Sequence, residues 1–166
     1  MTGKEIYDKL KAAFGNSIGE WNEQTASEYQ KRTSSYADVV EVSMLRDVCL
    51  YLRDDKDLAF DNLNLVSASD NGDKTLSCVY HMESMSKKQN FALKVTVPVE
   101  NPVVPSVTSV WAFANWHERE VYDMIGIKFL DHPDHRRILL DDDWIGHPLR
   151  KDYKQPEFYR GMKVPY

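Results

Sequence analysis

The sequence TLSCVYHM, residues 75–82, alternates apolar and polar side chains with a period of two. That period is typical of a β-strand with one buried face. The sequence FALKVTV at residues 91–97 alternates in the same way, and residues 86–88 (SKK) form a turn between the two. The pattern begins at Leu63 and passes through Asn-Gly at residues 71–72, a favoured hairpin turn. Together these segments predict an antiparallel meander with one buried face.

Two amphipathic segments before the meander predict helices. Residues 2–5 (TGKE) have the form of a capping box, and apolar residues follow at helical spacing up to Gly15. Apolar residues from Met44 to Leu52 share a second helical face, with Ser43 as its N-cap. Just before them, the three valines at positions 39, 40 and 42 suggest a short strand. We therefore expect an α+β fold, in which these helices cover a small, mostly antiparallel sheet.

Three prolines, at positions 98, 102 and 105, end the alternation and so end the sheet. A further helix is expected after them, capped by Ser106 or Ser109 and ending at Gly126. Regular structure then fades. We divide the chain into an α+β domain at residues 1–126 and an extended arm at residues 127–166.

The arm combines four prolines and many charges with several large aromatic side chains. An irregular segment of this length rarely packs on its own domain alone. Its aromatic side chains would nevertheless be costly to leave in water. An arm that becomes ordered against a partner protein satisfies both facts, and it is the strongest indication of function outside any motif.

The composition narrows the class of protein. The length of 166 residues suits one domain, and the net charge of -5 argues against general binding of nucleic acid. No stretch approaches the ~18 to 20 consecutive apolar residues of a membrane span, so we expect a cytoplasmic chain that meets a membrane only through partners.

Cys49 and Cys78 are expected to be buried thiols. There is no phosphate-binding loop, cysteine cluster or nucleophile motif, which predicts no catalytic or cofactor-binding residue here.

The most charged segment of any expected helix is Glu118-Arg119-Glu120, followed by Asp123. The spacing places Arg119, Glu120 and Asp123 on one helical face. Paired carboxylates can perform acid–base chemistry when burial separates their pKa values. Buried carboxylates beside an arginine more often form a paired network that fixes an interface. We favour the network and keep acid–base catalysis as the alternative.

Histidines near the arm raise the question of a metal site. His132, His135 and His147, with Asp134 and His117, are the residue types that bind zinc. Proline directly follows two of these histidines, and two arginines follow the 132–135 segment and would repel a cation. We do not expect a metal site, and a metal-dependent hydrolase using His132, Asp134 and His135 is kept as an alternative.

Two basic pairs, Arg136-Arg137 and Arg150-Lys151, lie in the same region. Acidic residues are interleaved with them, at positions 141–143 and at Asp152, which disfavours nucleic acid as the ligand. Arginine forms bidentate contacts with carboxylates, so contacts with a protein partner suit these pairs better.

Three segments of the chain together resemble one family. They are residues 116–127 (WHEREVYDMIGI), residues 132–139 (HPDHRRIL) and residues 146–153 (GHPLRKDY). In this order they are similar to the thirty-kilodalton subunit family of respiratory complex I, the proton-pumping NADH:quinone oxidoreductase. The resemblance covers roughly the last third of the chain, and the remainder resembles the family only in layout.

The positions that carry the resemblance hold charged residues, histidine, glycine or proline. They are Glu118, Arg119, Glu120, Asp123, Gly126, His132, Pro133, Asp134, Arg136, Arg137, Gly146, His147, Pro148, Arg150, Lys151 and Asp152. Some positions depart from the family: His135 stands where leucine is common, Asp131 where glycine is common, and Lys154-Gln155 delays the next proline.

The resemblance implies a peripheral subunit without catalytic residues or a cofactor of its own. Iron–sulfur clusters, FMN and quinone would be held by partner subunits of the hydrophilic arm, near the quinone site and the terminal clusters. The segments from Glu118 to Tyr153 would form a docking helix and the extended arm. The chain would support electron transfer from NADH to quinone, with proton translocation, on the cytoplasmic face of the inner membrane.

Other assemblies share the same motifs. The runner-up is the equivalent subunit of a membrane-bound nickel–iron hydrogenase, or of a ferredoxin- or F420-linked dehydrogenase, because one subunit does not reveal the electron donor. Outside this class stand the metal-dependent hydrolase and a general interaction domain unconnected with respiration.

Overall fold

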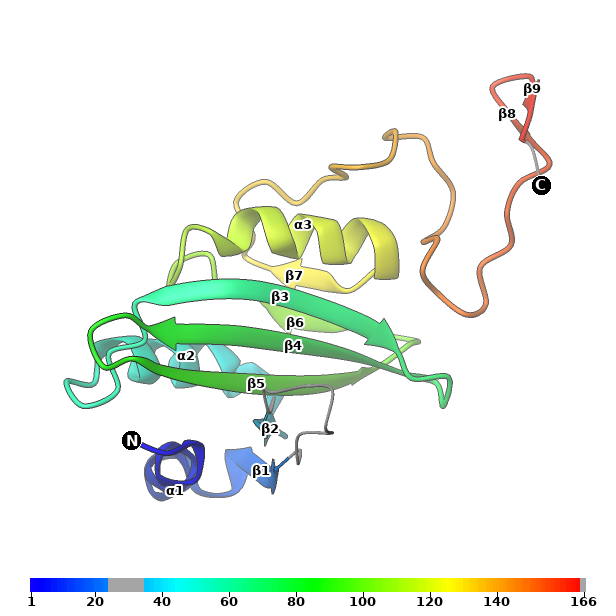
Figure 1. Ribbon diagram of the computed structural model, residues 1–166. Helices are drawn as coiled ribbons and strands as arrows, with labels where there is room; N and C mark the ends of the chain where they lie inside the picture. Colours follow the sequence, from blue (N-terminus) through cyan, green and yellow to red (C-terminus); the bar gives the residue numbers. More distant parts are fainter. Residues whose placement is uncertain (24–34, 165–166) are drawn as a thin grey trace, which may run out of the picture.

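A five-stranded sheet forms the centre of the computed structural model, which describes residues 1–23 and 35–164 (Figure 1). Its strand order is β1-β2-β5-β4-β3. The bounds are β1 Ile18–Asn22, β2 Tyr36–Val39, β3 Asn62–Asp70, β4 Thr75–Ser84 and β5 Gln89–Pro98. β3, β4 and β5 form the predicted antiparallel meander, whereas β2 pairs in parallel with β5 and β1 pairs antiparallel to β2. The expected α+β class with a mostly antiparallel sheet is confirmed.

One face of the sheet is buried, as the alternation predicts. On β4 the even positions from Leu76 to Met82 are buried, and the neighbouring odd positions are mostly half-buried. Three helices pack against the sheet: α1 (Gly3–Phe14), α2 (Leu45–Asp54) and α3 (Ala114–Ile125). The prediction named only the first two as the cover, but α3 runs alongside β3 (Figure 1).

The first helix follows its sequence signals closely. The Glu5 N–H donates to Thr2 Oγ1 at 3.3 Å and the Thr2 N–H donates to Glu5 Oε2 at 2.8 Å, which completes the capping box. The helix ends at Phe14 with Gly15 as its C-cap, and the short 3₁₀ turn η1 (Gly15–Ser17) follows.

The start of α2 differs from the prediction. A 3₁₀ turn, η2 (Val42–Met44), leads into the helix, so Ser43 is not its N-cap. The Ser43 hydroxyl donates instead to Glu41 at 3.3 Å. The predicted strand at the valines is partly wrong for the same reason, because β2 ends at Val39. The polar stretch from residue 20 to residue 35 lies mostly outside the described residues.

Beyond the sheet, α3 connects two short parallel strands, β6 (Val103–Pro105) and β7 (Lys128–Leu130). Neither Ser106 nor Ser109 caps α3, which begins later than predicted. The helix ends at Gly126, as predicted, because this residue takes a left-handed conformation with φ +86°.

The extended arm begins later than residue 127. Ile127 and Phe129 are buried in the core and β7 pairs with β6, so residues 127–130 belong to the domain. This shifts the predicted boundary to residue 131. We call residues 131–164 the C-terminal arm. It is irregular except for a small hairpin, β8 (Phe158–Tyr159) and β9 (Met162–Lys163), and it extends away from the sheet (Figure 1).

Candidate functional site

The C-terminal arm is attached to the end of α3. The last carbonyls of a helix have no partner inside it, and here the arm supplies the partners. The three successive carbonyls at residues 123–125 interact with His147 Nδ1 (3.1 Å), the Leu149 N–H (2.9 Å) and Arg150 Nε (2.6 Å). A carbonyl can only accept, so His147 carries its proton on Nδ1. The Arg150 cation also suits the negative end of the helix dipole.

Asp123 is the second attachment point. Its carboxylate is fully buried and accepts hydrogen bonds from the backbone N–H groups of residues 138–140, at 2.7–3.1 Å. Arg137 Nη1 lies 2.6 Å from the same carboxylate. Burial alone would raise the pKa of Asp123, but these four donors outweigh it and hold the pKa below its ordinary value. Asp123 is therefore a charged anchor for the arm.

Arg119 holds the preceding part of the arm. Its guanidinium donates to the carbonyls of Arg136 (3.2 Å) and Arg137 (3.1 Å) and pairs with Asp134 at 3.2 Å. The Arg119 side chain is nearly buried and lies over the ring of Trp116, 5.6 Å from its centroid. Arg119 and Asp123 thus form a paired network on α3 whose partners lie within this chain.

Glu118 points to a different part of the structure. Its buried carboxylate accepts from the Ser106 hydroxyl at 2.6 Å and from the Val107 N–H at 2.8 Å. His132 Nε2 lies 3.8 Å away. Burial raises the pKa of Glu118 to about 7, and its two hydrogen bonds oppose this rise only in part. Such a pKa would suit an acid–base group, but the side chain is fully buried. Glu120, by contrast, is exposed.

The two central histidines are engaged by the backbone. His132 Nδ1 accepts from the Asp134 N–H at 3.0 Å, and its Nε2 lies 3.2 Å from the Asn115 carbonyl. His135 Nε2 accepts from the Phe129 N–H at 3.1 Å. Burial lowers the pKa of both rings. Across residues 1–23 and 35–164, no group of three or more His, Cys, Asp or Glu side chains is arranged to hold a metal ion.

The remaining positions of the resemblance mainly shape the arm. Gly126 and Gly146 both have positive φ. A Cβ at Gly126 would lie 2.5 Å from His147, so glycine also allows that ring to approach. The Lys151 N–H donates to Asp70 at 2.9 Å and links the arm to the end of β3. Four other positions are exposed or half-buried: Arg136, Asp152, Pro133 and Pro148.

The distal part of the arm folds back on itself, which the sequence analysis missed. The Tyr159 hydroxyl lies within hydrogen-bond distance of the Asp141 (2.8 Å) and Asp143 (2.6 Å) carboxylates and donates its one proton to either, and its ring packs on Trp144 with centroids 4.8 Å apart. Arg160 pairs with Asp143 at 2.9 Å. The available signal was the run of three aspartates at residues 141–143, whose negative charge Arg160 later in the arm can balance.

An exposed apolar surface results from this anchoring. Leu139, Ile145 and Leu149 are 62%, 85% and 61% exposed, although the segments that carry them are hydrogen-bonded to α3. Phe158 and Met162 add further exposed apolar area on the hairpin. Large apolar side chains that stay exposed on a hydrogen-bonded segment are available for contact with another protein.

Comparison with known proteins decides the family. Residues 39–159 match the family described as respiratory-chain NADH dehydrogenase, 30 Kd subunit. The chain belongs to this family. It is 40% identical to an NADH-quinone oxidoreductase subunit of Chloroherpeton thalassium, over 96% of this chain and 64% of the relative. It is 38% identical to the corresponding protein of Chlorobium phaeobacteroides, over 96% of this chain and 93% of the relative. The resemblance found from the three segments is confirmed.

Two solved structures share the fold of this chain. The trypsin-resistant fragment (1–134) of Nqo5 has a TM-score of 0.60 and 22% identity, covering 79% of this chain and 97% of the fragment. A chain of the membrane-bound sulfane sulfur reductase, an archaeal respiratory membrane complex, has a TM-score of 0.65 and 18% identity, covering 92% and 85%. At these identities the likeness shows the fold alone. Within the described residues, no helix is long and apolar enough to cross a membrane.

Proposed function

We propose that this chain is a non-catalytic scaffold subunit in the peripheral part of a proton-translocating NADH:quinone oxidoreductase. The observation that carries the proposal is the C-terminal arm, which is bonded to α3 through Asp123, Arg119 and the helix-end carbonyls yet exposes three large apolar side chains. An ordered arm loses less conformational entropy on binding than a flexible one. The arm is therefore a prepared docking surface for neighbouring subunits.

We propose that the electron carriers lie in those neighbours. An iron–sulfur cluster generally takes four cysteine ligands, and this chain has two. Cys49 and Cys78 are both fully buried, and burial raises the pKa of the Cys78 thiol to about 12. Neither thiol is available as a ligand in this fold. Iron–sulfur clusters, FMN and quinone are accordingly assigned to partner subunits, and electron transfer from NADH to quinone is a property of the assembly.

The same proposal gives a location. The chain would sit at the cytoplasmic face of the inner membrane, held by the subunits around the quinone site and the terminal iron–sulfur clusters. Its net charge of -5 disfavours direct binding to anionic lipid headgroups and to nucleic acid. Contact with the membrane would therefore be indirect.

A second candidate is the equivalent subunit of a membrane-bound hydrogenase or of a ferredoxin- or F420-linked dehydrogenase. The shared fold with a chain of the sulfane sulfur reductase complex favours keeping it. Against it, the relatives compared above at about 40% identity are NADH-quinone oxidoreductase subunits. A flavoprotein that oxidises NADH, purified with the chain, would decide between the two.

The arm's role can be tested by changing Leu139, Ile145 and Leu149 together to serine in the complete chain. We expect the complex in solubilised membranes to lose this subunit on a native gel, while the free chain keeps its melting temperature. Met85→Ser is the matched control, because Met85 is 62% exposed in the turn between β4 and β5. Normal assembly of the triple variant would refute docking through the arm.

A further inference from the structure

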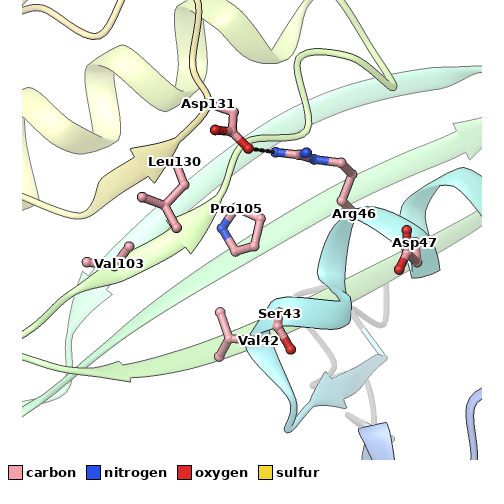
Figure 2. Close-up of a pocket in the computed structure, with 8 residues that line it drawn as sticks. All are labelled: Val42, Ser43, Arg46, Asp47, Val103, Pro105, Leu130 and Asp131. Atoms are coloured by element: carbon pink, nitrogen blue, oxygen red, sulfur yellow. Dashed lines mark hydrogen bonds and ion pairs between the residues drawn. The ribbon is translucent and has the colours of Figure 1, made fainter.

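A groove lies between the start of α2 and the β6–β7 pair (Figure 2). Its volume is about 480 Å³, which is room for a few side chains. The floor is apolar and comes from three elements. Val103 and Pro105 are alternate residues of β6 and share one face, Leu130 is the partner of Pro105 on β7, and Val42 closes the floor from η2.

The edges of the β6–β7 pair offer no donor to an added strand. The Val103 N–H already donates to the Asn101 carbonyl at 3.0 Å, and Pro105 has no N–H. On the other strand, the Phe129 N–H donates to His135 Nε2 at 3.1 Å. A partner can therefore bind only across the face, through side chains, and not by extending the sheet.

The rim of the groove carries excess negative charge. Arg46 is its cation, but Arg46 is occupied: Nε donates to the Ser106 carbonyl at 3.1 Å and Nη2 pairs with Asp131 at 2.9 Å. Asp47, on the other side, forms no ion pair with any residue in the described ranges. Glu41 lies next to the rim, because it accepts a hydrogen bond from Ser43. The groove is thus complementary to a cation.

Asp131 occupies its place at a conformational cost. Its φ is +60°, in the left-handed region that residues other than glycine rarely adopt. This turn directly follows Leu130 of the floor and carries the carboxylate that pairs with Arg46 (Figure 2). A non-glycine residue held in such a conformation is more common at binding sites than elsewhere.

We propose that this groove is a second docking site, which takes a segment of a neighbouring subunit that carries a large apolar side chain next to a lysine or arginine. The apolar side chain lies on Val103, Pro105 and Leu130, and the cation pairs with the exposed carboxylate of Asp47. The acidic rim repels phosphate and lipid headgroups, so a protein segment fits best. The inference rests on the proposed membership of an assembly of several subunits, but not on docking through Leu139, Ile145 and Leu149 of the arm.

The test places a photo-activated cross-linking amino acid at Ser43, an exposed residue of the groove, in the complete chain within the purified membrane complex. We expect one cross-linked peptide from another subunit, with Lys or Arg beside an apolar residue. The same amino acid at Met85 is the control and should not capture that peptide. No cross-link at Ser43, or one to lipid, to a second copy of this chain or to a peptide without a basic residue, would overturn the proposal.

Charge reversal separates this proposal from the proposed function. We expect Asp47→Lys to reduce the share of the chain recovered in the complex several-fold. Glu100→Lys, which changes an exposed carboxylate in the turn after β5, should have no effect. Equal recovery of both variants in an intact complex would overturn the groove and leave the scaffold role standing. Absence of any complex, even with the unchanged chain, would refute the scaffold role itself.

Discussion

The sheet and the C-terminal arm are held in place by different forces. β3, β4 and β5 bury apolar side chains such as Tyr80, Leu93 and Met82 on one continuous core. Within the described residues, the arm contributes none to that core and is held by hydrogen bonds and ion pairs to α3. Burial of apolar surface is non-directional and stabilises the whole domain. Buried polar bonds are directional, so they fix where the arm lies more than they stabilise the fold.

The same difference assigns stability mainly to the domain and assembly mainly to the C-terminal arm. The domain also exposes single apolar side chains, such as Val40 and Met85, but its sheet and helices bury one continuous core. The arm exposes Leu139, Ile145 and Leu149 because its place is fixed by polar atoms, which leaves these side chains unused. A chain built this way can fold alone and still present a surface for assembly.

The largest expected effect is in the sheet. Leu93 is fully buried at the centre of β5, so Leu93→Ala should lower the free energy of unfolding by about 2–5 kcal/mol. Thermal or urea unfolding measures the loss. Asn90→Ala, at an exposed position of the same strand, is the control and should change the stability little. Similar losses in the two variants would mean that the core does not dominate stability.

The arm should respond next to a change at Asp123. Asp123→Asn removes the charge that Arg137 and the N–H groups of residues 138–140 share, and breaking such a buried pair costs about 3 kcal/mol. Hydrogen exchange should become faster at residues 138–140 and stay unchanged in β4. Asp142→Asn, at an exposed neighbour within the arm, is the control. Unchanged exchange at residues 138–140 would contradict the anchoring role.

Gly126→Ala should lower the free energy of unfolding by a smaller amount, about 1–2 kcal/mol, because alanine is strained at the positive φ of this position. The added Cβ should also displace the His147 ring. Gly161→Ala isolates the first contribution, because Gly161 has φ +78° and nothing would contact its Cβ. Exchange at the Leu149 N–H reports the attachment to α3. If Gly126→Ala and Gly161→Ala changed exchange at the Leu149 N–H equally, the close approach of His147 to Gly126 would not matter.

Glu118 predicts a dependence of stability on pH. Its folded-state pKa of about 7 lies above the ordinary value of 4.5, so the folded state keeps a proton that the unfolded chain loses. The resulting stabilisation is complete below about pH 4.5 and is lost as the pH rises towards 7. Glu118→Gln cannot ionise, so its melting temperature should rise relative to the unchanged chain across this range. His135, whose pKa burial lowers, acts with the opposite sign in both proteins and cancels in the difference. A constant difference would contradict the raised pKa.

The smallest effect on stability is expected at two exposed positions of the family motifs. Arg136 is largely exposed and pairs only with Asp134 among the described residues, and Glu120 is exposed on α3. Arg136→Ala or Glu120→Ala should leave the melting temperature of the free chain nearly unchanged. Assembly in membranes should weaken, because we expect their main partners to lie across an interface. A large fall in melting temperature would place those partners inside the chain.

The sequence predicted the features that residues close together in the chain determine. The period-two runs predicted the meander, and the capping box predicted the start of α1. The pairing of β2 with β5 was missed, because a four-residue strand carries little periodicity and its partner lies far along the chain. Ser106 was misassigned as a cap because its hydroxyl is engaged by Glu118, a contact that only the folded chain creates. The network at α3 was expected. Its partners at residues 138–140 could not be predicted, because they are backbone N–H groups, which every residue except proline has.

The most direct test of the scaffold role is affinity purification of the tagged chain from solubilised membranes, followed by mass spectrometry and an assay of NADH-driven quinone reduction. The account predicts recovery of flavin and iron–sulfur subunits together with that activity. Recovery of iron–sulfur neighbours without NADH oxidation would contradict the assignment of NADH as donor and favour the hydrogenase or ferredoxin-linked relatives. A monomer without partners would contradict the scaffold role altogether.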